Sequence, residues 1–295
     1  MTILFALIAA SCNALNLVTQ HIASTSDPAH SKGWRFVRYL LSNPLWLFGW
    51  VALAGAFVFQ ALALHNGQMS VVQPLLVTEL VFALVLRRVW IHQEIRRVTW
   101  GAAALVCGTL ALFVAVSEPT GGTAVPASSA WAGAVAAIAG GSVLLALMSL
   151  RGSPFRRAAL LGAATSMLWA LVAAFIKAAT DTLTQYGLGG MFLHWPIYAL
   201  AVAGLAAEYL NQAALHVGPL SVSQPFLVVV DPIVSIGLSV WIFKETFTDD
   251  ALRLGLAAAA FAGMCVAVTV LVRTAPATME RGADVRARPD PATAS

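Results

Sequence analysis

Long apolar stretches alternate with short polar ones along the whole chain. A helix that crosses a membrane needs about 20 mostly apolar residues, and each long stretch meets that length. The stretches are also too continuously apolar for helices that lie on a membrane surface. We therefore predict nine membrane-spanning helices, at residues 2–23, 45–65, 69–90, 98–117, 129–150, 156–178, 192–214, 220–243 and 251–273.

The composition excludes a water-soluble domain. Hydrophobic residues make up 59% of the 295 and charged residues only 10%, whereas about a quarter of a soluble domain is charged. The net charge of +4 comes from short clusters between apolar stretches, so we expect no nucleic-acid partner. The three cysteines lie singly and are interpreted as packing residues. The expected fold class is all-α integral membrane, with the lipid bilayer as solvent.

One stretch of the sequence occurs twice, 151 residues apart. Residues 64–74 read Leu-His-Asn-Gly-Gln-Met-Ser-Val-Val-Gln-Pro, and residues 215–225 read Leu-His-Val-Gly-Pro-Leu-Ser-Val-Ser-Gln-Pro. The agreement indicates two related halves. The same offset relates two further identical pairs, Trp90 with Trp241 and Glu94 with Glu245.

The distribution of cations predicts the orientation of the chain. The odd-numbered loops and the C-terminal tail hold 14 of the 17 Lys and Arg residues. The positive-inside rule then places the N-terminus outside the cell membrane and the C-terminus in the cytoplasm. Residues 64–90 therefore run inward and their copy at 215–241 runs outward, so the halves are inverted.

These observations predict a 4+1+4 organisation: a first repeat at 1–117, a linker loop and connector helix at 118–155, an inverted repeat at 156–273, and a disordered cytoplasmic tail at 274–295. Inverted repeats are typical of secondary transporters, which expose a central site to each side in turn. The alternative is a non-transporting membrane scaffold, in which duplicated helices only form a stable bundle.

Three carboxylates lie inside predicted spans. Glu79 and Asp231 are at mid-span in the third and eighth helices, and Glu208 is in the inner part of the seventh. Charges at such depth usually face a cavity or a partner. Pro232 also frees a backbone carbonyl close to Asp231, which suits binding of a cation or proton. Because 79 plus 151 is 230, Glu79 and Asp231 are not strict repeat mates.

Amide side chains also lie at depth. Gln73 and Gln224 each precede a proline about one turn inside a span, where Ser70 and Ser221 are placed to cap the helix. The glutamines either line the substrate path or satisfy the local backbone. Further amides either bind substrate or bridge helices: Gln60, its repeat mate Asn211, and Asn13.

Other features point to no catalytic chemistry. Lys177 ends the sixth span, from where we expect its ammonium group to reach the lipid headgroups. His65 and His216 lie at span ends and are interpreted as ordinary hydrogen-bonding groups. The sequence has no GxxxxGK[ST], GxSxG, HExxH or CxxC pair, so it carries no signature of an ATP-driven pump, a serine hydrolase or a zinc protease. We expect no enzyme activity.

The sequence resembles the drug/metabolite transporter superfamily. The resemblance rests on Gly-Xaa-Xaa-Ser-Val-Xaa-Gln-Pro followed by an apolar span with an acid and then by Glu94 or Glu245. It extends to about Arg273 and is closer to EamA-like members and to the NIPA-type magnesium transporters. Features similar to the NIPA-type branch are Asn-Pro-Leu-Trp at 43–46, Gln60, and Ser-Val-Val-Gln-Pro at 70–74. EamA-like members usually have ten spans, so this chain is one helix short, as the NIPA-type branch is.

The resemblance implies secondary transport on inverted repeats. We expect a permease that moves a small metabolite by alternating access, with a Mg²⁺ transporter as the alternative. In the second case Glu79 and Asp231 would be the metal ligands. No cofactor is expected beyond a coupling proton or cation. The sequence is compatible with a homodimer.

Overall fold

The computed structural model describes residues 1–25, 42–122, 126–217 and 220–274. The predicted disordered tail therefore lies almost entirely outside the described residues. Within them, most of the chain is helical. The helices are α1 (Thr2–Thr25), α3 (Pro44–Asn66), α4 (Met69–Leu76), α5 (Glu79–Trp90), α6 (Arg97–Ser117), α7 (Ser128–Met148), α8 (Pro154–Met191), α9 (Pro196–Val217), α10 (Leu220–Trp241) and α11 (Ala251–Thr274).

Two very short strands join loops that are far apart in the sequence. β1 (Thr120–Gly121) follows α6, and β2 (Glu245–Thr246) follows α10. They pair antiparallel, with Thr120 opposite Thr246 and Gly121 opposite Glu245. With two residues each, they leave the helical class of the fold unchanged, but they fix the position of Glu245.

The protein is an all-α membrane protein. Seven of the described helical segments are long and apolar enough to cross a membrane, counting α4 and α5 as one. The apolar part of α10, Pro225–Trp241, is shorter, and α9 carries Glu208, Asn211 and Gln212. The expected all-helical membrane fold is thus supported, and the count of nine spans stays a prediction.

Burial separates central helices from peripheral ones. Within the apolar windows, 72% of α8 and 61% of the α4–α5 segment are buried, against 22–33% in the other five segments. Large apolar side chains cover much of the exterior, such as Leu205 and Leu252, which are 75% and 73% exposed. A water-soluble surface of this kind would aggregate, whereas lipid accommodates it.

The predicted third span is broken at its middle. α4 ends at Leu76, two residues form a turn, and α5 begins at Glu79. Pro74 precedes the break and weakens the helix next to it, because proline has no N–H to donate to the preceding turn and its ring clashes with that turn. The hydroxyl of Thr78 donates to the Leu75 carbonyl at 2.7 Å and satisfies one backbone acceptor there.

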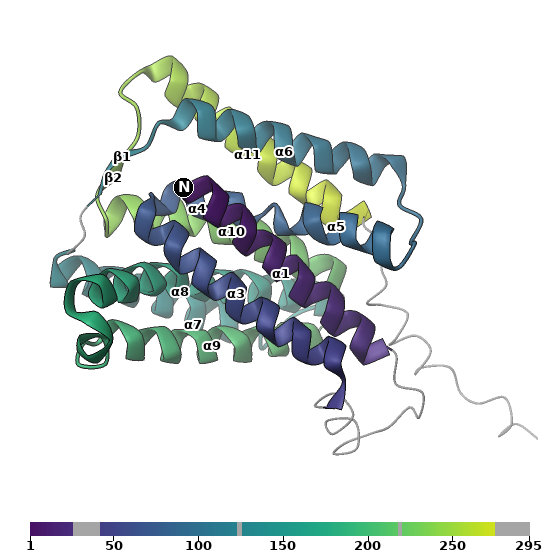
Figure 1. The fold of residues 1–295 in the computed structure, drawn as a ribbon, viewed down its shortest axis with the longest axis horizontal. Helices are drawn as coiled ribbons and strands as arrows, with labels where there is room; N and C mark the ends of the chain where they lie inside the picture. Colours follow the sequence, from purple (N-terminus) through teal and green to yellow (C-terminus); the bar gives the residue numbers. More distant parts are fainter. Residues whose placement is uncertain (26–41, 123–125, 218–219, 275–295) are drawn as a thin grey trace, which may run out of the picture.

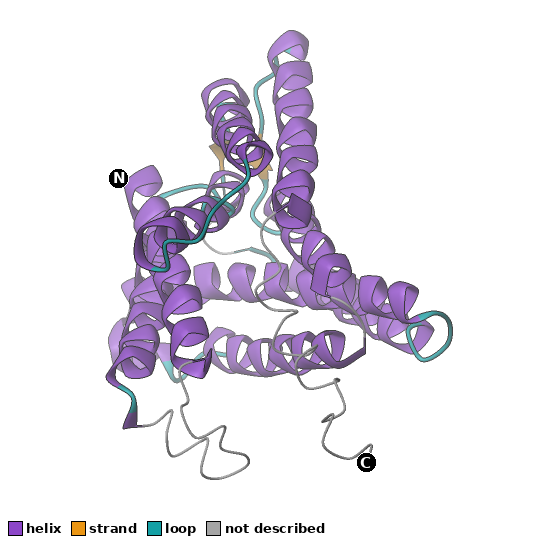
Figure 2. Ribbon diagram, turned by 90° about the vertical axis from the view of Figure 1, so that its right-hand side faces the viewer, coloured by secondary structure: helices purple, strands orange, loops and turns teal. Residues whose placement is uncertain are grey.

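The helices pack in pairs. α1 lies against α3, α8 against α9, and α6 against α11, while α10 contacts both α8 and α4. Figure 1 shows the α6–α11 pair along one edge of the molecule, and Figure 2 shows it set apart from the other helices. The ends of the repeated helices are also 151 residues apart, as in the sequence. The α4–α5 segment runs from Met69 to Trp90, and α10 runs from Leu220 to Trp241. The inverted relation of the halves remains a prediction.

Candidate functional site

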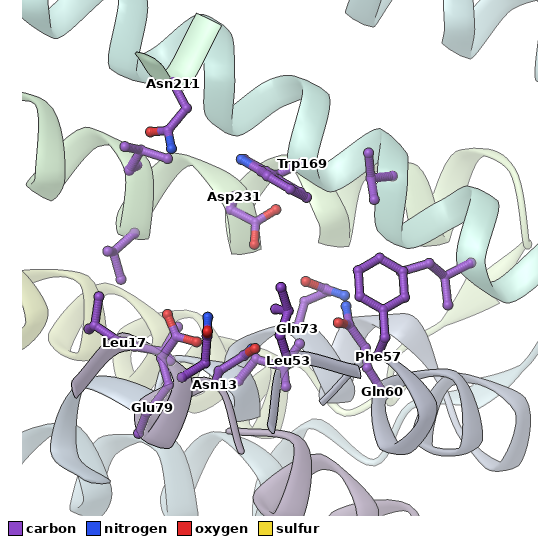
Figure 3. Close-up of a pocket in the computed structure, with 18 residues that line it drawn as sticks. Asn13, Leu17, Leu53, Phe57, Gln60, Gln73, Glu79, Trp169, Asn211 and Asp231 are labelled. Atoms are coloured by element: carbon purple, nitrogen blue, oxygen red, sulfur yellow. The ribbon is translucent and has the colours of Figure 1, made fainter. Parts of the chain in front are cut away.

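A cavity of about 420 Å³ lies between two groups of helices. In Figure 3, Asp231, Asn211 and Trp169 are on one wall, and Glu79 and Asn13 are on the wall across from it. The first wall comes from α8, α9 and α10, and the second from α1, α3, α4 and α5. Six of the eight candidate residues line this cavity: Asn13, Gln60, Gln73, Glu79, Asn211 and Asp231.

Glu79 owes its position to the break in the third span. It is the first residue of α5, where the unpaired N–H groups of a helix favour a negative charge. Figure 3 shows Asn13 of α1 beside the Glu79 carboxyl group. The break therefore turns a helix start toward the cavity at mid-span and places an acid on it.

Asp231 projects from α10 into the same cavity. The Ser235 hydroxyl donates to its Oδ1 at 3.4 Å, and the Trp169 ring lies next to it in Figure 3. Asp231 and Glu79 line the same cavity from opposite walls (Figure 3). None of the 18 lining residues is Lys, Arg or His. The arrangement can accept a proton or a cation.

Gln73 is the most enclosed polar group of the cavity wall. It is 2% exposed, and its Nε2 has no hydrogen-bond partner in the described chain. Figure 3 shows the amide directed into the cavity. A buried amide without a partner costs about 1–3 kcal/mol, so this group is available to a ligand or to water.

Two candidates are not brought to the cavity. Glu208 is exposed and accepts a hydrogen bond of 2.6 Å from Gln212 Nε2. The inner face of α9 carries Ala203 and Ala207, which are buried. Glu208 follows Ala207 directly, and successive residues of a helix are rotated by about 100° around its axis, so Glu208 points away from that face. The side chain of Gln224 lies outside the described residues.

Glu245 binds the start of α4, the helix that brings Gln73 to the cavity. Its side chain is 1% exposed and accepts hydrogen bonds from Met69 N at 2.8 Å, Ser70 N at 3.0 Å and Ser70 Oγ at 2.7 Å. The prediction that Ser70 caps this helix is wrong, because Ser70 lies inside α4. The cap is the carboxylate of Glu245, which satisfies the free N–H groups at the start of α4.

Lys177 belongs to the same end of the molecule. The ammonium group donates to the carbonyls of Leu64 at 2.9 Å and Gly67 at 2.8 Å and lies 4.0 Å from Glu245 Oε1. The side chain is 13% exposed, so the prediction that it reaches the lipid headgroups is wrong. The carbonyls at the end of α3 attract a cation instead. Nearby, His65 Nδ1 lies 3.1 Å from Asp181, which confirms an ordinary hydrogen bond for His65.

Buried apolar side chains lie next to these polar contacts, which we call the seal: Glu245, Lys177 and the helix ends that they bind. Leu64 and Met69 are fully buried and Phe243 is 1% exposed. Sequence reasoning missed this cluster, because an acid in a loop is usually a surface residue. The one signal was the identity of Glu94 and Glu245 in the repeat.

The described residues do not form a conventional metal centre. They contain no group of three or more His, Cys, Asp or Glu side chains that could hold a metal ion. The side-chain oxygens of the cavity lining come from two carboxylates and from amides.

Comparison with known proteins adds one relative. No family model matches the chain, and no solved structure matches it. The sequence is 30% identical over 251 residues to an uncharacterized protein of Corynebacterium glutamicum, and the match covers 84% of this chain and 86% of the relative. The chain belongs to the family of that Corynebacterium glutamicum protein.

Proposed function

We propose that the protein is a multipass secondary transporter that moves a small metabolite by alternating access. The observation that carries the proposal is the cavity itself. It lies between helices of the two predicted repeats, and both of its walls bring an acid to mid-span, Glu79 from one and Asp231 from the other. Ionisable groups at this depth mark substrate and ion pathways in membrane proteins.

The arrangement of the helix ends supports inverted halves. The α3–α4 turn, β1, β2 and the Lys177 end of α8 meet at one end of the molecule. The cation count assigns all of these segments to the outer side. Broken helices at a central site are also typical of transporters built from inverted repeats, and the α4–α5 break is of this kind.

The closed end supports alternating access. Glu245 and Lys177 bind the start of α4 and the end of α3, and we infer that these contacts close the cavity toward the side predicted to be outside. A transporter needs a second state in which these contacts break and the other end closes. A scaffold needs neither the cavity nor its acids.

The Mg²⁺ alternative has weaker support. Mg²⁺ demands six oxygen ligands in octahedral geometry and usually keeps several waters. The cavity offers two carboxyl groups, from opposite walls, and much of its remaining lining is apolar, including Leu53 and Val172. We therefore keep a small organic metabolite as the proposed substrate.

Thiol labelling tests whether the cavity opens to both sides. The test uses oriented vesicles, a membrane-impermeant thiol reagent, and the chain with Cys12, Cys107 and Cys265 replaced by Ala. We expect Phe57→Cys, at the cavity wall, to react from both sides. The control Val58→Cys, exposed outside the cavity, should react from neither. Reaction of Phe57→Cys from one side only, or from none, favours the scaffold.

A further inference from the structure

The charged groups of the cavity are all of one sign. Glu79 and Asp231 are the only charged residues among the 18 that line it. The nearest cation along α8, Lys177, is held by the carbonyls of Leu64 and Gly67. Carboxylates taken out of water either take up a proton or are stabilised by a compensating positive charge, and the cavity walls supply no cation.

The two acids face the same space. They line one cavity and come from its opposite walls in Figure 3. A single positive group between them would relieve their repulsion and compensate both. The Trp169 ring, next to Asp231, adds a surface that attracts cations, above all organic ones.

The rest of the lining suits an organic body. A volume of about 420 Å³ is in the range of small-molecule sites, which are mostly apolar with a few polar groups. Apolar walls come from four helices, through Leu17, Leu53, Val172 and Val228. The unpartnered amide of Gln73 supplies a hydrogen-bonding group at the closed end.

We propose that the cavity binds a small organic ammonium compound, with its charged group between Asp231 and Glu79 and its apolar part against Trp169 and the aliphatic walls. This inference names the substrate class of the proposed transporter. It depends on the proposed function only for the statement that the bound compound is then transported. The two acids, when ionised, would repel anionic metabolites, including free carboxylates and phosphates.

A matched probe series tests the charge requirement. The purified full chain in detergent is titrated with 1,4-diaminobutane, n-butylammonium, 1,4-butanediol, glutarate and MgCl₂ at equal ionic strength, and heat of binding and thermal unfolding are recorded. We expect saturable binding and a raised unfolding temperature with the two ammonium probes alone. Equal or stronger binding of butanediol or glutarate, or no binding of either ammonium probe, overturns the inference.

Variants assign the binding to this cavity. Asp231→Asn should weaken ammonium binding about 10- to 100-fold, because a charged hydrogen-bond partner is lost. Glu208→Gln, at an exposed acid outside the cavity, should leave it unchanged. If Asp231→Asn fails to fold, Trp169→Phe decides, with an expected loss of about 2- to 30-fold. If the variant that folds, Asp231→Asn or Trp169→Phe, binds the ammonium probes with unchanged affinity, the inference is overturned. It is also overturned if the protein binds Mg²⁺ through Asp231 and does not bind the ammonium probes.

Flux measurements separate this inference from the proposed function. Proteoliposomes are loaded with radiolabelled 1,4-diaminobutane and its exchange is followed. Binding that depends on Asp231, without any exchange, would contradict transport and leave the site assignment standing. Labelling of the cavity from both sides, without ammonium binding, would contradict the substrate class and leave alternating access standing.

Discussion

The two copies of the repeated stretch have the same sequence pattern and different surroundings. In the first copy, the start of α4 is capped by the buried carboxylate of Glu245. Glu94, the residue 151 positions before Glu245, is exposed and forms no hydrogen bond or ion pair within the described chain. Within the described residues, one acid of the pair is thus engaged in hydrogen bonds and its counterpart is not, which is the asymmetry that the proposed alternating access predicts for a single state.

The copies also differ at mid-span. The first is divided into α4 and α5, whereas α10 continues through Pro225 and Pro232. Thr78, whose hydroxyl satisfies a carbonyl at the break, corresponds to Val229, which has no such group. A proline alone therefore does not break these helices, and Thr78 is a difference between the two copies that lies at the break itself.

The largest effect is expected from removing the engaged acid. Glu245→Ala leaves the N–H groups of Met69 and Ser70 without their acceptor and Lys177 without its nearby charge. We expect a loss of about 3 kcal/mol in the free energy of unfolding, measured by thermal or denaturant unfolding in detergent. The matched variant Glu94→Ala should stay within about 0.5 kcal/mol of the parent. If the two variants lowered the free energy of unfolding equally, the proposed difference between the two copies would be wrong.

Lys177→Met tests the second half of the seal. Met retains most of the apolar stem but donates no hydrogen bond to Leu64 O or Gly67 O. We expect a loss of about 2 kcal/mol, smaller than for Glu245, because Glu245 keeps its three donors from α4. Thiol labelling of Phe57→Cys from the outer side should rise. A loss larger than that of Glu245→Ala would make Lys177 the dominant group.

Thr78→Val gives the first copy the residue found in the second. The Leu75 carbonyl loses its hydroxyl partner, which should destabilise the break by about 1 kcal/mol and shift Glu79 relative to the cavity. Ammonium binding should weaken along with stability. Thr269→Val is the control, because Thr269 makes the same type of bond, at 2.8 Å to Cys265 O, in an unbroken helix. A similar effect on binding there would contradict a special role for the break.

The smallest effect is expected from an ion pair on the surface of the same end. Arg253 Nη1 lies 2.6 Å from Glu118 Oε2, but both side chains are about half exposed, at 49% and 55%. Exposed pairs contribute little because water and salt screen them. Arg253→Ala should cost no more than about 0.5 kcal/mol in unfolding experiments, and less at high salt. If Arg253→Ala lowered the free energy of unfolding as much as Lys177→Met, the surface ion pair would have to be counted among the contacts that hold this end together.

The sequence predicted most of the helices and most of the cavity. Apolar length located the spans, and the cost of a charge at depth identified Glu79 and Asp231 as inward-facing groups. The same reasoning failed for Glu208, because α9 is polar on two neighbouring faces and the sequence does not show which face packs inward. The break at Thr78 was also missed, since Pro74 and Pro225 occupy equivalent positions and only one of the two spans is divided.

The contacts of the closed end were beyond sequence reasoning for another reason. Lys177 and Glu245 lie next to predicted membrane boundaries, where charged side chains normally face water or headgroups. Their burial depends on loops from different parts of the chain meeting through β1 and β2. Contacts between loops that are distant in the sequence depend on the tertiary structure, and no local sequence pattern predicts them.

The cap on α4 also sets an order of events during synthesis. Ser70 and the carboxylate that caps its helix are 175 residues apart, so α4 enters the membrane long before its partner leaves the ribosome. Until then the first N–H groups of α4 need water or lipid headgroups as acceptors. This contact can therefore form only after α10 and β2 have been synthesised, which places it late in the assembly of the protein.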